Sequence, residues 1–193
     1  MLVSLLKSDP RMRLEGRRVF IRMPQASDWA QWAQLRESSR DFLAPWEPLW
    51  PSDDLSKAAF GRRLRRYSQS VRQGALYPFF AFAKEDETLV GGITLTNVRH
   101  GTVQGCSIGY WVGEQYARNG YMSDTIQVAL SFAFDSLGLH RVEAACLPEN
   151  KPSRGLLLKS GFTEEGYVRE YLKICGSWRD HVRFGILATD PRT

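Results

Sequence analysis

The chain has 193 residues, of which 43% are apolar and 24% are charged, so it can bury a sizeable core and has the composition of a soluble globular protein. These values argue against a disordered chain and against a coiled coil. We expect one domain over residues 1–193, with its core between about 17 and 189. The formal net charge of +5 and the pI near 9.3 favour acidic partners, because summed positive charge concentrates anions near the surface.

The start of the chain carries no export signal. The apolar run between Met1 and Lys7 is short, and Asp9 and Pro10 follow it. No stretch approaches the length of a membrane span, so we expect a cytoplasmic protein without membrane contact. The chain has three cysteines, Cys106, Cys146 and Cys175. Their odd number and the lack of C-x-x-C spacing argue against disulfides and a metal site, so we expect each to be buried filler, that is, a small hydrophobic residue in the core. No cluster of metal ligands is visible, and no metal is expected.

The first part of the chain predicts a strand, a helix and an aromatic loop. The strand covers residues 19–24, and the helix follows over 29–39, where Ser27 or Asp28 can cap its first turn. Residues 40–54 are rich in Pro and Trp and predict a loop that either serves function or covers a hydrophobic edge. Its large aromatic side chains are Phe42, Trp46 and Trp50.

Residues 55–74 predict a second helix with an apolar stripe and a basic face. The stripe has helical spacing: Phe60, Leu64, Tyr67 and Val71. Four arginines fall mostly off it: Arg62, Arg63, Arg65 and Arg66. Because a basic helix face can neutralise phosphates, the Arg62–Arg66 face is a candidate contact for a ribosome or RNA. The alternative is a solvated helix face, since no base-reading module accompanies the arginines.

From residue 77 the pattern changes to strands, a long helix and a final hairpin. Strands are expected over 77–84, 88–99 and 102–113. A helix follows from Met122 to Leu137, and Gly138 closes it. The remaining elements are a strand over 141–147, a short helix over 152–160, and strands over 164–174 and 179–187. This order favours a mixed α/β sheet with helices on its faces.

A short match to the G-x-S-x-G motif of serine hydrolases lies at Gly105–Gly109. A nucleophile elbow needs a sharp turn into a helix after the serine, whereas Ser107 is followed by "IGYWVG", which continues a strand. Asp180 and His181 are adjacent on one expected strand, so their side chains point to opposite faces and cannot simply form the relay. The serine-hydrolase hypothesis is therefore disfavoured.

The strand-to-helix junction at residues 111–122 is the first candidate site. The strand ends at Val112 or Gly113 and the helix begins near Gly120, so the first-turn N–H groups lack intrahelical partners and carry the positive end of the helix dipole. Such a turn favours anions, although neither common phosphate-binding glycine motif is present. At the next helix, Asn150 can cap, Pro152 is tolerated in the first turn, and Ser153 follows.

With these features the sequence resembles the GCN5-related N-acetyltransferases. The resemblance implies the α/β fold of that family: a mixed, mostly antiparallel sheet of about seven strands with helices on both faces, and acetyl-CoA bound where the fourth and fifth strands splay apart. The family's diphosphate-binding [RQ]-x-x-G-x-[GA] loop corresponds to Ala117–Met122. Only Gly120 matches the strict form, because Ala117 replaces the usual Arg or Gln and Met122 replaces the usual small residue.

The resemblance narrows to ribosomal-protein-alanine N-acetyltransferases of the RimJ type. It is carried from about residue 17 to 188 by "FLAPWEP", "NGYM", "HRVEA", "NKPS", "LLKSGFTEEGYVREYL" and "GSWRDHV". It implies cofactor contacts at Trp111, Val112, Ala117, Arg118, Asn119, Gly120, Tyr121, Met122, Asn150 and Ser153. It also implies an acceptor cleft formed by the aromatic loop and the last hairpin, with Trp46, Glu47, Tyr110, Asp180 and His181. For His181, bracing of the hairpin is the alternative.

Acetyl transfer from a thioester needs a neutral amine, a donor to the developing oxyanion and a proton for the leaving thiolate. A backbone N–H near Val112 is the candidate oxyanion donor. Ser153 is the family-matched proton donor, with a helix-start hydroxyl of purely structural role as the alternative. An α-amine has a pKa of about 8 against about 10.4 for lysine, so a protein N-terminus needs only a modest base. Glu170 is the candidate and Glu143 the reserve, unless both are ordinary surface carboxylates.

The leading hypothesis is therefore an acetyl-CoA-dependent N-acetyltransferase that modifies a protein N-terminus, in particular the N-terminal alanine of a ribosomal protein. A small-molecule amine acceptor remains open, because loops form the acceptor walls of this fold. A hypothesis of another class is a non-catalytic ribosome- or RNA-binding protein that keeps the fold and uses the Arg62–Arg66 face.

Overall fold

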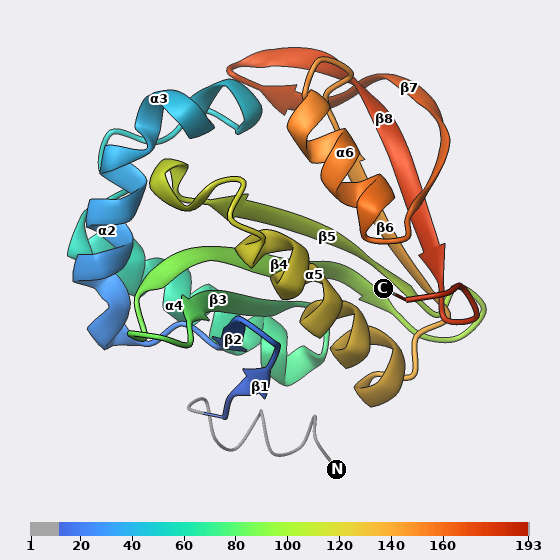
Figure 1. Ribbon diagram of the computed structural model, residues 1–193. Coiled ribbons are helices and arrows are strands. Elements are labelled where there is room, and N and C mark those ends of the chain that lie inside the picture. Colours follow the sequence, from blue (N-terminus) through green and yellow to red (C-terminus); the bar gives the residue numbers. More distant parts are fainter. Residues whose placement is uncertain (1–11, 193) are drawn as a thin grey trace.

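The computed structural model describes residues 12–192, which form one eight-stranded sheet in the order β1-β2-β3-β4-β5-β6-β8-β7 (Figure 1). The strands are β1 (Leu14–Glu15), β2 (Val19–Arg22), β3 (Tyr77–Ala83), β4 (Leu89–Arg99), β5 (Gly105–Val112), β6 (Arg141–Cys146), β7 (Thr163–Ile174) and β8 (Ser177–Leu187). Within these residues β5 and β6 are the one parallel pair. The expected mixed, mostly antiparallel sheet is confirmed: its seven strands are β2 to β8, and the two-residue β1 is too short for a sequence pattern to reveal.

Helices cover both faces of the sheet, as expected. They are α2 (Trp29–Ser38), α3 (Arg40–Leu43), α4 (Lys57–Gln73), α5 (Tyr121–Ser131) and α6 (Lys151–Lys159). In Figure 1, α5 and α6 lie in front of the sheet and α4 lies behind it. Behind the sheet, rings from α2, α4 and β3 form an aromatic cluster that includes Trp32, Phe60 and Phe80. In front, the larger core packs apolar residues of α5, such as Ile126 and Leu130, against the strands.

The helix ends follow the sequence signals in part. Ser56 caps α4 by accepting a hydrogen bond from the Ala59 N–H at 3.1 Å, and Gly74 ends this helix in the left-handed conformation. Asp28 stands at the start of α2 but makes no side-chain cap, so that part of the prediction is wrong. Its carboxylate instead accepts hydrogen bonds from both terminal nitrogens of Arg22, at 2.6 and 2.7 Å, and from the Gln25 N–H.

Two segments differ from the expected secondary structure. Residues 40–46, expected as loop, form α3 and a 3₁₀ turn over Ala44–Trp46, turns too short to produce a periodic pattern. The helix expected to run from Met122 to Leu137 changes at Phe132–Ser136 into a π turn, in which the Leu137 N–H donates to the Phe132 carbonyl at 3.0 Å. The apolar stripe continues through both forms, so the sequence pattern did not distinguish them.

Asp124, in the first turns of α5, fastens this helix to the β1–β2 hairpin. Its buried carboxylate accepts hydrogen bonds from the backbone N–H groups of Arg17, Arg18 and Val19, at 3.2, 2.7 and 3.0 Å. Three donors on one carboxylate satisfy backbone groups that no strand partner reaches. The N-terminal hairpin and α5 therefore form one structural unit.

Asp124→Ala is expected to lower the free energy of unfolding by about 3 kcal/mol, because it leaves one buried and two part-buried N–H groups without an acceptor. Urea denaturation followed by fluorescence measures the change. The control is Asp135→Ala, which breaks only the exposed ion pair with Arg192 and should cost less than about 1 kcal/mol. Equal losses in the two variants would contradict the assigned role of Asp124.

Candidate active site

The sheet opens between β5 and β6, which are the fourth and fifth of the strands expected from the sequence. Residues Gly105–Ile108 of β5 pair with Arg141–Ala144 of β6, whereas Gly109–Val112 pair only with β4. Backbone N–H groups alternate in direction along a strand, and the Gly113 N–H points to β4, where it donates to the Val90 carbonyl at 2.9 Å. The N–H of Val112 therefore points the other way, into the gap. A main-chain donor is thus aimed at a place where the sheet offers no partner strand.

A hydrogen bond between Tyr110 and Ser153 spans the gap. Tyr110, on the diverging part of β5, brings its Oη to 2.8 Å from the Oγ of Ser153 in the first turn of α6. Burial raises the pKa of the Tyr110 phenol, a shift that the hydrogen bond with Ser153 partly opposes. The phenol therefore keeps its proton at neutral pH. The pair thus places two hydroxyl groups, each able to donate a hydrogen bond, inside the sheet opening.

The start of α6 holds Ser153 in place. Asn150 caps the helix as expected, since its Oδ1 accepts a hydrogen bond from the Ser153 N–H at 3.1 Å, and Pro152 lies in the first turn. The hydroxyl of Ser153 also interacts with the thiol of Cys146 at the end of β6, whose pKa burial raises. Ser153 is thereby fixed through its backbone and its side chain, between β5 and β6.

The loop before α5 has the backbone of an anion-binding turn. Gly120 is the N-cap residue, with φ 83°, and makes no side-chain cap, and Arg118 is also left-handed at φ 64°. The first N–H groups of α5 therefore have no capping side chain. Met122 buries its side chain in the core, so only its backbone faces the turn. Ala117 is half-buried, and Arg118 and Asn119 are exposed.

Arg18 adds positive charge to this turn. Its Nη1 donates to the Asn119 carbonyl at 2.6 Å, and its guanidinium lies 5.1 Å from the centre of the Tyr121 ring. The sequence did not predict this role for Arg18.

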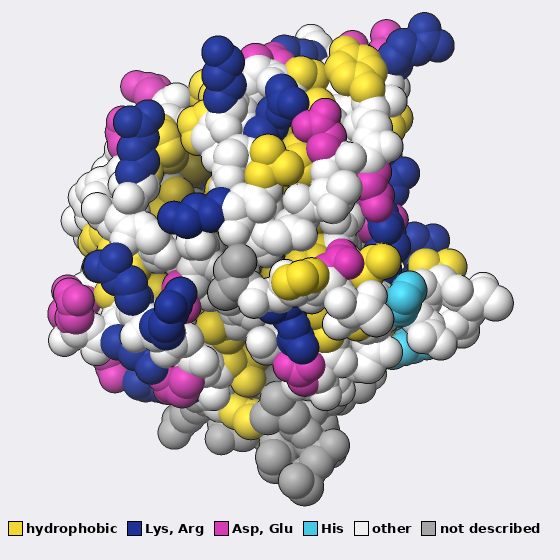
Figure 2. Space-filling model, turned by 45° about the vertical axis from the view of Figure 1, so that its right-hand side comes forward, with side chains coloured by type: hydrophobic (Ala, Val, Ile, Leu, Met, Phe, Trp, Pro, Cys, Tyr) yellow, Lys and Arg dark blue, Asp and Glu magenta, His cyan; other side chains and the backbone are white. Residues whose placement is uncertain are grey.

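Ser39 holds the other end of the loop, which the sequence did not predict either. It is buried, and its hydroxyl accepts a hydrogen bond from the Glu114 N–H at 3.0 Å. The face in Figure 2 shows several Lys and Arg side chains around a hollow with hydrophobic side chains inside it.

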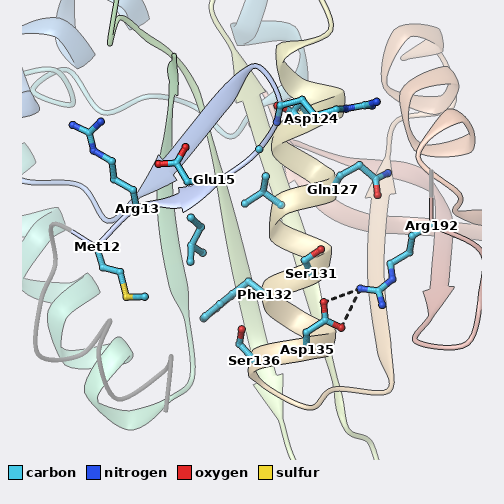
Figure 3. A pocket seen from close by; sticks show the side chains of 14 residues that line it. Met12, Arg13, Glu15, Asp124, Gln127, Ser131, Phe132, Asp135, Ser136 and Arg192 are labelled. Atoms are coloured by element: carbon cyan, nitrogen blue, oxygen red, sulfur yellow. Dashed lines mark hydrogen bonds and ion pairs between the residues drawn. The ribbon is translucent and has the colours of Figure 1, made fainter. Parts of the chain in front are cut away.

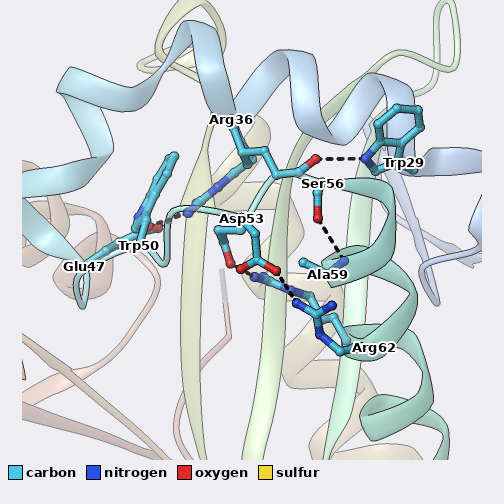
Figure 4. A network of polar contacts seen from close by, with 11 residues as sticks. Trp29, Arg36, Glu47, Trp50, Asp53, Ser56, Ala59 and Arg62 are labelled. Carbon is cyan, nitrogen blue, oxygen red and sulfur yellow. Dashed lines mark hydrogen bonds and ion pairs between the residues drawn. The ribbon is translucent and has the colours of Figure 1, made fainter.

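Behind the sheet, a buried arginine joins the aromatic loop to β5 (Figure 4). Arg36 of α2 forms a bidentate ion pair with Glu47, at 2.5 and 2.7 Å, and its guanidinium lies 4.1 Å from the Trp50 ring and 5.0 Å from the Trp111 ring. The Trp50 Nε1 donates to Glu47 at 2.7 Å. The Trp111 indole thus lies on the face opposite to Tyr110. Trp46 is half-buried in the 3₁₀ turn before Glu47.

The same loop touches the tip of the β7–β8 hairpin. The Cys175 N–H donates to the Glu47 carbonyl at 3.1 Å, and the Cys175 thiol lies 3.0 Å from the Ala44 carbonyl. The two segments expected to border the acceptor thus meet directly. Cys175 is exposed, so its interpretation as buried filler is wrong, whereas Cys106 and Cys146 are buried as expected.

Two further residues of the expected acceptor cleft lie on β8. Asp180 accepts hydrogen bonds from the Tyr167 hydroxyl at 2.5 Å and the Glu170 N–H at 2.7 Å, and these lower its pKa, the tyrosine having the larger effect. His181 is buried, with its Nδ1 2.9 Å from the Arg179 carbonyl and its ring against Tyr171. His181 therefore braces the hairpin.

The two candidate bases have different surroundings. Glu170 is exposed in a bulge of β7, with φ 47°, and within residues 12–192 its carboxylate has no ion-pair partner. Glu143 on β6 is held by Arg141 at 3.0 Å and Arg183 at 2.9 Å. Each carboxylate oxygen of Glu143 is therefore engaged by an arginine, Oε1 by Arg141 and Oε2 by Arg183. Neither carboxylate contacts the Tyr110–Ser153 pair among the residues described.

A cavity of about 800 Å³ lies apart from this opening, between β1 and α5 (Figure 3). It follows α5 from Asp124 to Ser131 and the π turn from Phe132, reaches the exposed Asp135–Arg192 ion pair, and borders Met12. Tyr110, Gly120 and Ser153 do not line it. We therefore assign it no part in the chemistry of the opening.

Other site types find no support in the described part of the chain. Ser107 lies within β5, paired with Thr96 and Glu143, so the nucleophile elbow is absent there. Residues 12–192 hold no group of three potential metal ligands. None of the described helices has the length and apolar character needed to cross a bilayer.

Comparison with known proteins gives consistent results. The family model "Acetyltransferase (GNAT) domain" matches residues 18–163. The chain is 30% identical over 181 residues, 94% of its length and 93% of the relative's, to the [Ribosomal protein uS5]-alanine N-acetyltransferase of Escherichia coli K12. It resembles the solved structure of Mycobacterium smegmatis RimJ in complex with CoA-disulfide, with TM-score 0.84 and 34% identity over 88% of this chain and 82% of that one. It also resembles the solved structure of the ribosomal-protein-S5-alanine acetyltransferase of Vibrio fischeri, with TM-score 0.85 and 25% identity over 94% of this chain and 100% of that one.

Arg36→Met is expected to lower the free energy of unfolding by about 2 kcal/mol, because the Glu47 carboxylate and the indoles lose a buried cation. Glu47 retains 22% of its side-chain exposure, which limits the loss. Arg13→Met is the matched control: Arg13 also pairs with a carboxylate, Glu87, and stacks on Phe20, but at the exposed surface, so its loss should be below about 1 kcal/mol. Urea denaturation of both variants makes the comparison, and similar losses would contradict the conclusion that Arg36 joins the aromatic loop to β5.

Proposed function

Because the chain belongs to the acetyltransferase (GNAT) domain family, and is thus an acyltransferase, we propose that it transfers the acetyl group of acetyl-CoA to the α-amine of a protein N-terminus, in particular the N-terminal alanine of a ribosomal protein. The proposal draws on the names of relatives that share nearly the full chain. It includes a single acetyltransferase domain over residues 1–193 and a cytoplasmic location.

The observation that carries the proposal is the Tyr110–Ser153 hydrogen bond across the opening between β5 and β6. On one side of it lies the N-terminus of α5, with uncapped amides and Arg18 for a diphosphate. On the other side lie the aromatic loop and the hairpin tip, which meet through Glu47 and Cys175. The residues present fit coenzyme A, and a solved relative of 34% identity carries CoA-disulfide.

Acetyl-CoA supplies a thioester, an activated acyl donor. In the proposed reaction the amine nitrogen attacks the thioester carbonyl, a C–N bond forms and the C–S bond breaks. The Val112 N–H, which points into the opening, donates to the carbonyl oxygen as it becomes negative. Ser153, backed by the Tyr110 phenol, donates the proton that the leaving thiolate takes. Asn150 orients Ser153, and Gly120 and the following amides hold the cofactor phosphates.

The nitrogen must lose one proton in the reaction. An α-amine has a pKa of about 8, so a modest base suffices. Glu170 is the proposed base, acting through water from the exposed bulge, because Glu143 is engaged by two arginines. Trp46, Glu47, Tyr110 and Asp180 border the acceptor, with Glu47 held by Arg36 and Asp180 held by Tyr167. Trp111 remains a predicted cofactor contact. His181 supports the hairpin from inside.

Thiol release from acetyl-CoA, measured with peptides that begin with Ala, Ser or Met and with free amines, tests the function. We expect transfer to the Ala peptide, with the product acetylated at the α-amine by mass spectrometry. Ser153→Ala and Tyr110→Phe should each lower kcat about 10- to 100-fold, with less than additive effects in the double variant, because they act as one unit. Turnover of free amines alone would favour a small-molecule acceptor, and no turnover with any amine would contradict the proposal.

The pH profile gives an independent expectation. We expect kcat/KM to rise as the α-amine deprotonates near pH 8. Since burial raises the pKa of Tyr110, its phenol stays protonated, and the profile should show no fall below about pH 10. A decline between pH 7 and pH 9 in folded protein would argue against Tyr110 as a protonated partner of Ser153.

Gly120→Ala is expected to raise the KM for acetyl-CoA about tenfold, because an alanine at φ 83° shifts the turn that presents the α5 amides. Gly138→Ala is the matched control: this glycine is also left-handed, at φ 65°, but an added Cβ there meets nothing within 4 Å. Both variants should lose similar stability, of about 1 kcal/mol. An unchanged KM in Gly120→Ala would contradict the assignment of the diphosphate to this turn.

A further inference from the structure

The exposed face of α4 is basic and carries no acidic side chain. The helix sequence, KAAFGRRLRRYSQSVRQ, contains no Asp or Glu. Phe60 and Val71 are buried against the sheet, and the opposite side exposes Ala58, Arg62, Arg65, Arg66, Gln69 and Arg72 at helical spacing. Arg62, Arg65, Arg66 and Gln69 together line one open hollow. We call these four residues the α4 basic face.

The four clustered arginines of α4 differ in their surroundings: Arg62, Arg63, Arg65 and Arg66. Arg63 is half-buried, pairs with Asp54 at 2.6 Å and lies 4.9 Å from the Trp32 ring, so it serves the fold. Arg62 pairs with Asp53, but both side chains remain about half exposed, at 52% and 53%. Within the described residues, Arg65 and Arg66 have neither an ion pair nor a hydrogen bond from their side chains.

This lack of neutralisation contrasts with many other surface arginines of the molecule. Four exposed or half-exposed arginines elsewhere are paired with carboxylates: Arg13 with Glu87, Arg141 with Glu165, Arg154 with Glu164, and Arg179 with Glu149. On α4, Arg62 is three and four residues from Arg65 and Arg66, so the like charges repel one another. Asp53 compensates Arg62, but among the described residues no carboxylate pairs with Arg65 or Arg66, so these two side chains are available for an anionic partner.

We propose that the α4 basic face binds the phosphate backbone of RNA. A polyanion offers a row of phosphates, which matches guanidinium groups repeated along one helix side. Arginine binds phosphate in bidentate fashion and stacks on unpaired bases, whereas the face has no lysine among its four residues. A membrane surface fits less well, because the exposed positions of α4 lack the large apolar side chains that enter a bilayer interface.

The α4 basic face is joined to the aromatic loop. Asp53 and Asp54 of the loop pair with Arg62 and Arg63 of α4, and the same stretch of chain carries Glu47 and Trp50 (Figure 4). RNA held on α4 therefore lies beside the loop that borders the opening. This placement rests on the proposed function, in which a ribosomal protein supplies the acceptor; the RNA contact itself does not.

Fluorescence anisotropy with a labelled RNA hairpin, titrated at several NaCl concentrations, tests the contact. We expect the plot of log K against log salt for the unaltered protein to have a clear negative slope. Arg65→Gln with Arg66→Gln should reduce the magnitude of that slope by about 2, one phosphate contact for each arginine, and weaken binding at least tenfold. Arg65→Lys with Arg66→Lys, which keeps the charge, should retain most of the slope.

The matched control is Arg99→Gln with Lys159→Gln, which removes the same charge from exposed positions on β4 and α6. It should leave the slope within about 0.5 of the unaltered value. Equal effects of the two double variants, no binding at low salt, or tighter binding to anionic phosphatidylglycerol vesicles than to RNA would overturn the proposal. Acetylation of a free Ala-starting peptide should be unchanged in Arg65→Gln/Arg66→Gln, so a failed transferase and a failed RNA contact are distinguished.

Discussion

The separation of β5 from β6 is the constraint on which the rest of the molecule depends. Their parallel pairing lasts for Gly105–Ile108 and then stops, which leaves main-chain groups of β5 without a neighbouring strand on that side. Such groups are costly inside a folded protein unless something binds them. The unpaired groups of β5 lie near the Tyr110–Ser153 pair, the uncapped end of α5 and the capped end of α6.

The two sides of the opening are built by different means. In front of the sheet, hydrogen bonds set the position of each group: Asn150 fixes Ser153, and Ser39 and Arg18 hold the loop before α5. Behind it, a single buried cation, Arg36, is stacked between two indoles and held by Glu47. In the proposed function, backbone and small side chains would therefore serve the cofactor, while large aromatic surfaces would serve the acceptor. This difference suits a constant cofactor and a variable acceptor.

Periodicity and turn residues predicted seven of the eight strands, the two long helices and the cap at Asn150, and the family resemblance, which the family model confirms, rested on motifs such as "NGYM" and "NKPS". Arg36 and Asp124 escaped notice for a physical reason. A charged residue in an amphipathic helix is expected on the exposed face. Only the tertiary structure shows that Arg36 and Asp124 are buried with their partners. The π turn at Phe132 was hidden because its apolar spacing matches a helix. The proposed base, Glu170, has no sequence signature, because exposed carboxylates are common.

The Asp124 contact has a consequence for how the chain acquires its structure during synthesis. The amides of Arg17, Arg18 and Val19 leave the ribosome early, yet their acceptor follows more than 100 residues later. Until α5 emerges, water has to take the place of the Asp124 carboxylate at those donors. Residues 17–19 therefore reach their native contacts only after most of the polypeptide is available.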